Sequence, residues 1–435
     1  MARMAVAGAV ESPTLWATRV IPLILAGCVG YATYVVPKRI CIDYFLHTRQ
    51  QPGVAIAFLV LYCTLMCLML ITYLRVFLVI QYNPGVVPLG AGVIESRARP
   101  KKRKKACGRG QELDDLEANS GRYESKPDPN PDSPGLERYY SKDVFVCASD
   151  GRPKWCSHCG NWKPDRAHHS SEIGRCVRKM DHYCPWVGGI VSETSFKFFL
   201  QFVFYATLYC LVVLAAGALS LSLSIRSGSG ADGFVIGVLA IGGFFGLFAF
   251  AMTLTGMRYV LINLTNIDDL QAKFMVYQLA IRVPRDTPPG EKYGIITYPL
   301  PKPESRKYES GNDSGTHLSG STSEGNELVS ARDALATRTF AIVKTEMGEN
   351  PWHLGLYGNW KSVMGSNVFD WLLPIRQSPC VTYENNESFY EMGPLCRELR
   401  TRYGLPEISD ENVRSEKQAS EKMPRDREAH ASRAP

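Results

Sequence analysis

The residues best suited to chemistry lie in one short stretch, WCSHCGNWKPDRAHHSSEIGRCVRKMDHYCPWVGGI. Cys156 and Cys159 form a C-x2-C pair, a spacing that presents two sulfurs to one metal ion. Cys176 and one imidazole, from His168 or His169, would complete a tetrahedral Cys3His site. A site closed by four protein ligands is structural, so we expect zinc there. The spacing alone leaves both histidines open.

Cys184 has no place in that ligand set, which makes it a candidate nucleophile. It follows His182 by two residues, and residues i and i+2 of an extended segment share a face. The thiol and the imidazole could therefore meet, while Tyr183 points away. A nearby imidazole raises the fraction of a cysteine that is thiolate at neutral pH. Simple alternation leaves Asp181 on the opposite face from His182, so an orienting contact between them requires a turn at Asp181.

Long apolar runs on either side of this stretch indicate a membrane protein. A helix that crosses a bilayer needs about 20 mostly apolar residues, and four runs reach that length with few or no charges in their middle. Buried helices of a soluble protein are the alternative, but the remaining polar chain is short for covering four of them. We predict an α-helical polytopic membrane protein with four transmembrane helices and a zinc-stabilised, cysteine-rich domain between helices 2 and 3. The runs are residues 15–36, 53–74 (extending to 80), 197–225 and 233–257.

Four spans place both termini and the segment between spans 2 and 3 on one side of the membrane. Positive residues near the membrane mark the cytosolic side, although the two sides compete here. The cytosol keeps thiols and thiolate metal sites reduced. We therefore expect a multi-pass protein of an endomembrane or the plasma membrane, with both termini and the cysteine-rich domain in the cytosol. The residues that favour this orientation are Arg3, Arg19, Arg97, Arg99, Arg178, Lys179 and Arg258, and those that oppose it are Lys38, Arg39 and Arg49.

The totals exclude other classes of protein. The chain has 435 residues, enough for two or three domains, and a formal net charge of +7, which is too slight and uneven to indicate nucleic acid. Its 13 cysteines lie mainly in apolar segments or in the cluster, which argues against a secreted disulfide framework. No N-terminal signal peptide is evident in the sequence.

Shifts in composition divide the rest of the chain. The basic run RPKKRKK precedes ELDDLEA and KPDPNPDSPG, which is typical of a solvated linker. Beside a span, the basic run either rests on anionic lipid head groups or has no partner. We predict an N-terminal segment with spans 1 and 2 (1–80), a largely disordered linker (81–150), the cysteine-rich domain (151–196), spans 3 and 4 (197–257), a cytosolic segment (258–308), a disordered linker (309–330), a C-terminal cytosolic segment (331–405) and a disordered tail (406–435).

The cysteine-rich stretch resembles that of the DHHC-type protein S-acyltransferases (palmitoyltransferases), and most of all their fungal variants, in which the signature tetrad reads DHYC. Here the tetrad is Asp181-His182-Tyr183-Cys184, and KPDRAHH, KMDHYCPWV and the placement between spans 2 and 3 also fit. The resemblance covers the four spans and the whole cluster, and it weakens in the linker and tails. It implies that Cys184 is the acylated nucleophile, that His182 is its base and that Asp181 orients the imidazole.

The family pattern contains two Cys3His zinc sites, and this sequence matches only one of them. The positions that match the first site are Cys156, Cys159, His169 and Cys176. The positions that would hold the second carry Ser170, Ile173, Tyr183 and Ile190. Complete replacement of the ligands, partly by apolar residues, can convert a metal site into a small packed core. We therefore predict one structural zinc ion, with Tyr183 and the isoleucines packing in place of the other.

The resemblance also implies the substrates. Palmitoyl-CoA, or another long-chain acyl-CoA, would donate the acyl group, and membrane-associated proteins with cytosolic cysteines would accept it. The acyl tail prefers the interior of the lipid bilayer, whereas the phosphate-rich head prefers cations in water. Arg178 and Lys179 are the candidate cations for that head. The expected reaction is a two-step transfer through an S-acyl-enzyme on Cys184.

Three shorter elements also resemble parts of the family. NPG follows span 2, TNID follows span 4, and NPWHLGLYGNWKSVMG lies nearer the C-terminus. Their plain alternatives are a turn, a polar helix start and a packed cytosolic loop. The elements occupy residues 83–85, 265–268 and 350–365.

Three other functions were weighed against acyl transfer. A non-catalytic membrane scaffold with a zinc knuckle would need no reactive thiol at Cys184. A membrane thiol oxidoreductase would need a resolving cysteine near Cys184, and the nearest ones are assigned to zinc. A metal transporter is disfavoured because no predicted span carries the carboxylate or histidine ligands expected along an ion path.

Overall fold

The computed structural model describes most of the chain, and the described residues form two compact units. The described residues are 13–98, 136–140, 142–272, 275–298, 338–381 and 390–408. Unit 1 comprises Met1–Tyr123, Lys163–Met275 and Asn350–Pro394, and unit 2 comprises Glu124–Trp162, Val276–Glu349 and Leu395–Pro435.

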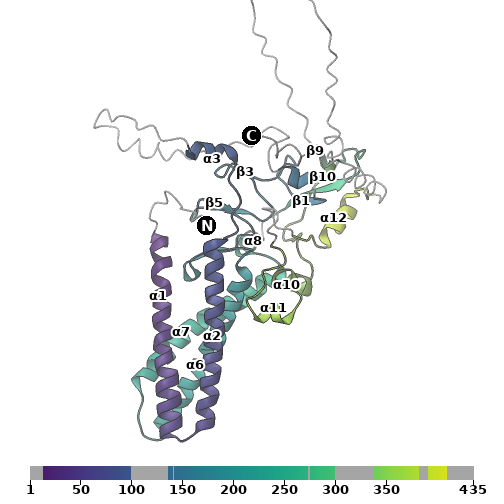
Figure 1. Ribbon diagram of the computed structural model, residues 1–435. Coiled ribbons are helices and arrows are strands. Elements are labelled where there is room, and N and C mark those ends of the chain that lie inside the picture. Colours follow the sequence, from purple (N-terminus) through teal and green to yellow (C-terminus); the bar gives the residue numbers. More distant parts are fainter. Residues whose placement is uncertain are drawn as a thin grey trace, which may run out of the picture. The chain divides into compact units, whose positions relative to one another are not determined.

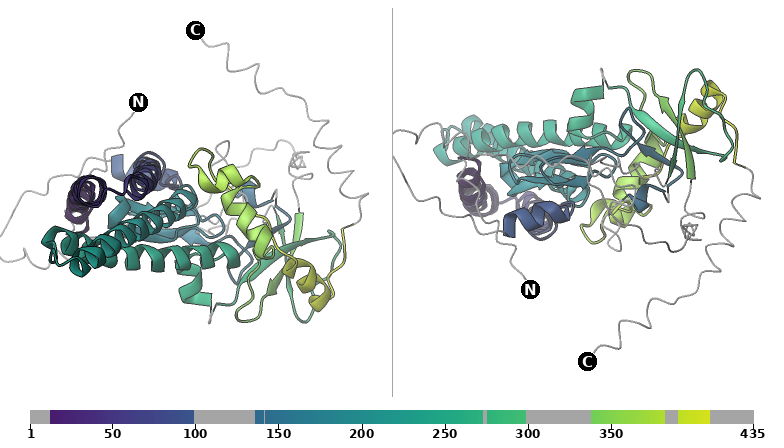
Figure 2. Two further views of the ribbon diagram at one scale, coloured as in Figure 1. Left: turned by 90° about the horizontal axis from the view of Figure 1, so that it is seen from below. Right: turned by 90° about the horizontal axis from the view of Figure 1, so that it is seen from above.

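Unit 1 is built around a bundle of long helices, which run side by side in Figure 1 and are seen from two further sides in Figure 2. Among the described residues, four helices are long and apolar enough to cross a membrane, so the predicted four-span architecture is confirmed. The helices are α1 (Pro13–Thr33) with its continuation η1 (Tyr34–Thr48), α2 (Pro52–Tyr82), α6 (Phe196–Arg226) and α7 (Gly233–Ile262).

The first span is longer than the sequence indicated. Its apolar helix covers Val20–Thr48, whereas we expected an end at residue 36. The chain continues through Lys38 and Arg39 in wider π-helical turns because both cations find partners. The Lys38 ammonium lies 2.6 Å from Asp43, and Arg39 donates to the Asp232 carboxylate at 2.8 and 3.1 Å. Lys38 and Arg39, which the predicted end of span 1 at residue 36 left in the loop that follows it, therefore belong to the end of that span.

Two small antiparallel hairpins between α2 and α6 carry the candidate site. One pairs β4 with β5 and sets His169 opposite Cys176, and the other pairs β6 with β7. A tight turn, η2, joins β6 to β7 and ends at Gly188, whose φ is +83° and whose added Cβ would lie 2.7 Å from Phe77. Only glycine suits that turn. The elements are β4 (His168–Ser170), β5 (Arg175–Val177), β6 (His182–Cys184), η2 (Pro185–Val187) and β7 (Gly189–Val191).

Shorter helices complete unit 1. One follows α2, one follows α7, and two more lie beside the bundle in Figure 1. They are α3 (Ala91–Ala98), α8 (Asn266–Ala272), α10 (Leu356–Met364) and α11 (Val368–Leu372).

Unit 2 contains a four-stranded antiparallel sheet in the order β1-β8-β10-β9. Its core is aromatic, with Phe145, Tyr298 and Phe340 in mutual edge-to-face or tilted contact. A separate short hairpin pairs β2 with β3. The elements are α5 (Glu137–Tyr140), β1 (Val144–Val146), β2 (Trp155–Cys156), β3 (Asn161–Trp162), β8 (Gln278–Val283), β9 (Gly294–Tyr298), β10 (Arg338–Lys344) and α12 (Leu395–Tyr403).

Parts of the three segments predicted to be disordered lie outside the described residues. These parts are residues 99–135 and 141 of the first linker, all of 309–330, and 409–435 of the tail. The described flanks of the first linker carry α3, α5 and β1.

Candidate active site

The strand β6 places the candidate nucleophile and its histidine on one face. Cys184 is 6% exposed and belongs to an apolar cluster with Phe199, and the His182 ring meets Phe199 edge-on at 5.3 Å between centroids. Tyr183 packs on the other side, in a separate cluster with Ile190. The alternation predicted along this strand is confirmed.

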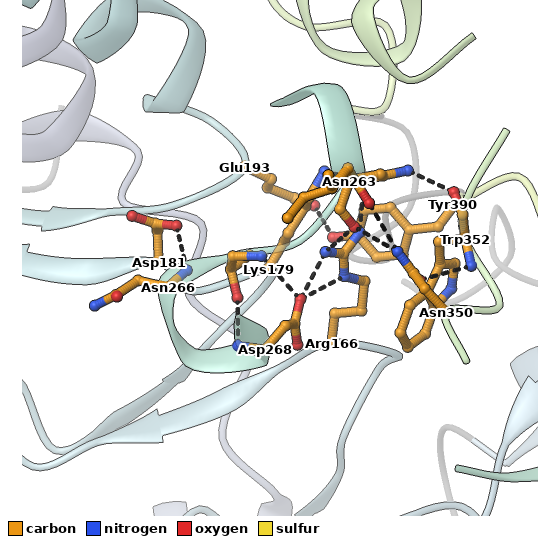
Figure 3. Close-up of polar contacts among 12 residues, drawn as sticks. Arg166, Lys179, Asp181, Glu193, Asn263, Asn266, Asp268, Asn350, Trp352 and Tyr390 are labelled. Atoms are coloured by element: carbon orange, nitrogen blue, oxygen red, sulfur yellow. Dashed lines mark hydrogen bonds and ion pairs between the residues drawn. The ribbon is translucent and has the colours of Figure 1, made fainter. Parts of the chain in front are cut away.

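Asp181 contacts His182 because it lies just before the strand. Its Oδ2 lies 2.6 Å from Nδ1 of His182, and its Oδ1 accepts the backbone N–H of Asn266 at 2.8 Å. Its own N–H donates to the carbonyl of Val191 at 3.0 Å. The carboxylate is buried, and Figure 3 shows it beside Asn266. If the strand had included Asp181, alternation would have placed its carboxylate on the face opposite His182. Asp181 instead lies just before β6, and the chain there allows the carboxylate to contact the imidazole.

The surroundings of His182 favour its protonated form. Burial lowers the pKa of the imidazole, but the Asp181 carboxylate and the interaction with Cys184 outweigh burial and raise the pKa to about 9. Among the described residues, Nε2 has no partner with the geometry of a full hydrogen bond, so we treat its interaction with Cys184 as electrostatic. At neutral pH the histidine is therefore an imidazolium.

The four residues predicted to bind zinc come together. Gly160 closes the turn after the C-x2-C pair by donating to the carbonyl of Cys156 at 2.8 Å. Nδ1 of His169 and Sγ of Cys176 lie 4.0 Å apart. The candidate ligand atoms of these residues and Cys159 all lie within 4.8 Å of one another. Ligand atoms of a tetrahedral zinc ion lie about 3.5–4 Å apart, and the three thiols are buried and free of disulfides, so the donor set fits a structural zinc ion.

The positions matched to a second zinc site are packed or hydrogen-bonded instead. Ile190 is 1% exposed and lies in an apolar cluster that includes Ile173 and Tyr183. Ser170 is buried, and its hydroxyl donates to Glu172 at 2.6 Å. The predicted packing of Tyr183 and the isoleucines is confirmed, whereas a total of one zinc ion stays a prediction.

The two cations expected to hold an anionic head group have different surroundings. Arg178 is buried, and its Nε lies 2.7 Å from Oε1 of Glu193 in an ion pair that is not aligned as a hydrogen bond. Lys179 donates to Oδ1 of Asn263 at 3.2 Å and lines a small pocket together with Leu354 and Tyr390. Burial and the charge of Arg166 lower the pKa of Lys179 to about 8. Arg178 is thus held by Glu193, while Lys179 lines a pocket beside Asn263 and Tyr390.

Arg166 joins the cysteine-rich stretch to the end of α7, a role that the sequence reasoning missed. Its guanidinium lies 2.6 Å from the Asp268 carboxylate and donates to the side chain and backbone oxygens of Asn263 at 2.9 and 3.0 Å (Figure 3). It also lies 4.8 Å from the centroid of the Trp352 ring. Burial raises the pKa of Asp268, but Arg166 outweighs burial and leaves that pKa below its usual value. The arginine in KPDRAHH and the acid in TNID were the available signal.

The NPG element ties the end of α2 to the start of α6. The carbonyl of Asn83 accepts a hydrogen bond from the Thr194 hydroxyl at 2.8 Å. The carbonyl of Pro84 accepts one from the Ser192 hydroxyl at 3.0 Å. The element therefore does more than turn the chain, because it sets how span 2 meets the segment that follows β7.

The C-terminal element caps the end of α7. The last carbonyls of a helix lack partners within the helix, and two asparagine side chains supply them here. Asn350 donates to the carbonyl of Ile262 at 2.8 Å, and Asn359 donates to that of Leu261 at 2.6 Å. The stretch is thus packed against span 4 rather than being an independent loop.

An apolar cavity lies within the helix bundle, near the turn that follows Cys184. It is lined by side chains of α1, α2, α6 and α7. Trp186, two residues beyond Cys184, forms part of its wall together with Tyr73 and Tyr209. A lining of this kind suits a hydrocarbon chain better than a polar ligand.

Comparison with known proteins gives relatives over nearly the whole chain. The family model described as DHHC palmitoyltransferase matches residues 149–273. A protein of Aspergillus fumigatus named palmitoyltransferase pfa5 is 37% identical over 423 residues, which cover 91% of each chain. Palmitoyltransferase pfa5 of Emericella nidulans is 37% identical over 434 residues, 89% of this chain and 86% of that one. Palmitoyltransferase PFA3 of Saccharomyces cerevisiae is 30% identical over 252 residues, 55% and 57% of the two chains.

Loss of one zinc ligand should remove the metal and destabilise the cysteine-rich stretch together, because a structural site supplies folding free energy. We expect one zinc ion per chain in the purified full-length protein by elemental mass spectrometry, and none in Cys156→Ala. Cys210→Ala, which removes a buried thiol in the bundle, is the control and should retain the metal. Two zinc ions per chain would contradict the single-site interpretation.

Ile190→Ala should lower the free energy of unfolding by about 2–5 kcal/mol, because it leaves a cavity in a packed cluster. Ile94→Ala is the matched control: Ile94 is 54% exposed on α3, and its loss should change stability by less than about 0.5 kcal/mol. Denaturant unfolding of both variants in one detergent measures the difference. Equal stability of the two variants would show that the cluster is not packed.

Asp181→Asn should lower the pKa of His182 from about 9 by roughly 1–3 units, because it removes the opposing charge. The folded-state pKa lies above the value of about 6.5 for an unfolded chain. The pair therefore stabilises the fold fully below that value, and this contribution is lost as pH rises through about 9. Histidine NMR measures the pKa, and Asp269→Asn, which removes a carboxylate paired with Arg258, is the control. An unchanged pKa in Asp181→Asn would refute the assigned contact.

Proposed function

Because the chain belongs to the DHHC palmitoyltransferase family and is a protein S-palmitoyltransferase, we propose that the sulfur of Cys184 carries the acyl group from donor to acceptor. The observation that supports this most is the placement of Cys184 and His182 on one face of β6, with Asp181 bound to the imidazole. Cys184 also lies outside the cluster of metal-ligating side chains.

The proposed first step acylates the enzyme. The Cys184 thiolate attacks the carbonyl carbon of the palmitoyl-CoA thioester, and a new carbon–sulfur bond forms. The bond between that carbon and the sulfur of CoA breaks. The departing CoA thiolate takes a proton from the His182 imidazolium and leaves as the thiol. No electron is gained or lost, and the histidine is now neutral.

The proposed second step transfers the acyl group to the protein substrate. Neutral His182 accepts the proton of the incoming cysteine thiol, and the resulting thiolate attacks the acyl carbon. The bond to Cys184 breaks, and its sulfur leaves as a thiolate beside the imidazolium. The pair returns to its starting state. A pKa of about 9 for the imidazole supports this cycle, because the imidazolium that protonates the leaving CoA thiolate is in place before the donor arrives.

Zinc in the Cys156, Cys159, His169 and Cys176 cluster would hold the shape of the stretch that precedes β6 and would take no part in bond making. Four protein ligands leave no open position for water or substrate. The chemistry therefore belongs to the side chains of Asp181, His182 and Cys184.

The acyl donor has an apolar tail and an anionic head, and the chain has an apolar cavity for the tail and cationic side chains for the head. The apolar cavity beside Trp186 would take the fatty tail, since its lining comes from the four spans. The phosphate-rich head would meet Lys179, with Arg178 behind it in its ion pair with Glu193. Cys184 lies in sequence between these two regions, where the thioester has to be.

The site would work on the cytosolic face of an endomembrane or the plasma membrane. Four spans put both termini and the cysteine-rich stretch on one side, and the reduced cytosol suits free thiols. The acceptors would be membrane-associated proteins with cysteines near that surface, because a soluble acceptor would have to reach a thioester held at the lipid boundary.

Cys184→Ser should abolish incorporation of labelled palmitate that neutral hydroxylamine releases, because a serine hydroxyl is a far weaker nucleophile at neutral pH. The purified full-length protein should show this label in the absence of any protein substrate. Cys396→Ser, which changes a cysteine on α12 that lines neither the apolar cavity nor the one beside Lys179, is the control and should incorporate label normally. Thioester-linked label that persists in Cys184→Ser would remove Cys184 from the nucleophile role and would favour a scaffold function for this stretch.

A further inference from the structure

Residues 366–376 form a short segment in unit 1 that exposes a row of apolar side chains. Val368, Phe369, Leu372 and Ile375 are 53, 70, 45 and 68% exposed. The first three lie on α11, and the fourth follows it. A gathered apolar surface of this kind marks an interface with a protein or a membrane. We propose that this face inserts into the bilayer leaflet on the side of the cysteine-rich stretch.

Hydrogen bonds fix the position of α11 along α6. The Tyr205 hydroxyl donates to the carbonyl of Leu372 at 2.8 Å. The amide of Gln201 donates to backbone carbonyls at 3.1, 3.0 and 3.2 Å, those of Asp370, Trp371 and Leu373. Figure 1 shows α11 against the flank of the bundle. The short helix is therefore held to a membrane span by side chains of that span.

The length of α6 shows how deep these contacts lie. Its 31 residues extend over about 46 Å, while the hydrocarbon core of a bilayer is about 30 Å thick. When the helix is centred, roughly 8 Å at each end lies among the head groups. Gln201 is about 8 Å and Tyr205 about 14 Å from the start of the helix. Gln201 thus lies at the edge of the hydrocarbon and Tyr205 within it, and α11 shares their level.

The polar groups of α11 are satisfied in the way that this depth requires. In hydrocarbon each backbone N–H and C=O needs a protein partner, because water is absent. The last carbonyls of the helix, which a helix leaves unpaired, receive the hydrogen bonds from Gln201 and Tyr205. At its start, Oδ1 of Asn367 accepts the N–H of Phe369 at 3.1 Å. The ring N–H of Trp371 donates to the carbonyl of Gly365 at 2.8 Å.

The inner face of the segment leads toward the active site, while its edge carries charge. Trp371 packs against the apolar cluster that contains Cys184. Arg376 is 76% exposed and lies 3.8 Å from the Asp370 carboxylate, where a long cationic side chain can reach the head groups. The segment thus exposes apolar side chains, turns its polar backbone groups toward α6 and carries a basic side chain at its edge. Membrane anchors that lie in the lipid–water interface have this arrangement.

A protein partner is the other occupant to weigh for this surface. The bilayer is favoured because Gln201 and Tyr205 hold the segment against a membrane-spanning helix, at the level where that helix enters the hydrocarbon. If the segment lay in water, water would hydrogen-bond its backbone carbonyls. The partners that α6 supplies through Gln201 and Tyr205 would then be unnecessary. The inference concerns where the segment lies and does not depend on which residue carries the acyl group.

The test is the environment of residue 369 in the full-length protein reconstituted into bilayers. A polarity-sensitive fluorescent amino acid replaces Phe369, and quenching by lipids brominated in their acyl chains is compared with quenching by aqueous iodide. We expect blue-shifted emission, quenching by the brominated lipid and a loss of quenching by iodide.

The matched control is position 270. Leu270 is 74% exposed on α8 and directly follows Asp269, whose partly exposed carboxylate pairs with the exposed Arg258 and favours water there. A probe there should be quenched by iodide and spared by the brominated lipid. Equal access of iodide to the two positions would overturn the proposal and would leave the apolar face to a protein partner. The measurement is independent of acyl transfer, so its outcome does not rest on the proposed mechanism.

Discussion

The buried carboxylate of Asp181 is the contact on which the rest of the site depends. One oxygen binds Nδ1 of His182 and the other accepts the N–H of Asn266, so one group joins β6 to the segment after α7. A buried charge is stable only when its partners are in place. The N–H of Thr265 and the guanidinium of Arg166 both bind Asp268, which holds the start of α8 where Asn266 can donate. The histidine is therefore oriented by the whole junction between the cysteine-rich stretch and span 4.

Side chains along β6 alternate between its two faces, and the two faces contact different clusters. His182 and Cys184 face the cluster that continues into α2 and α6, where an apolar cavity opens nearby. Tyr183 faces the cluster built on Ile190, at positions where the family pattern places metal ligands. Hydrophobic packing thus supports the back of this strand, and a zinc ion in the cluster of Cys156, Cys159, His169 and Cys176 would support the hairpin before it. A strand held in this way can present its thiol at a membrane surface without using that thiol as a ligand.

Sequence reasoning predicted the features that depend on local pattern and missed those that depend on distant partners. The spans follow from runs of apolar residues, and the pairing of His182 with Cys184 follows from a period of two. Arg39 was placed in a loop because its partner, Asp232, lies 193 residues away. The ion pair of Arg166 with Asp268 joins residues 102 apart. The sheet of unit 2 escaped prediction for the same reason, since its strands come from segments on both sides of spans 3 and 4.

The central claim is that an imidazolium held by Asp181 makes the sulfur of Cys184 reactive toward a thioester. The most direct measurement is a single-turnover reaction of the full-length enzyme with palmitoyl-CoA, with the acylated peptide identified by mass spectrometry at each time point. The account predicts that the acyl group appears first on Cys184 and that His182→Ala slows its appearance by about 10²–10⁴-fold. An acyl group that appears first on another cysteine, or an unchanged rate in His182→Ala, would contradict it.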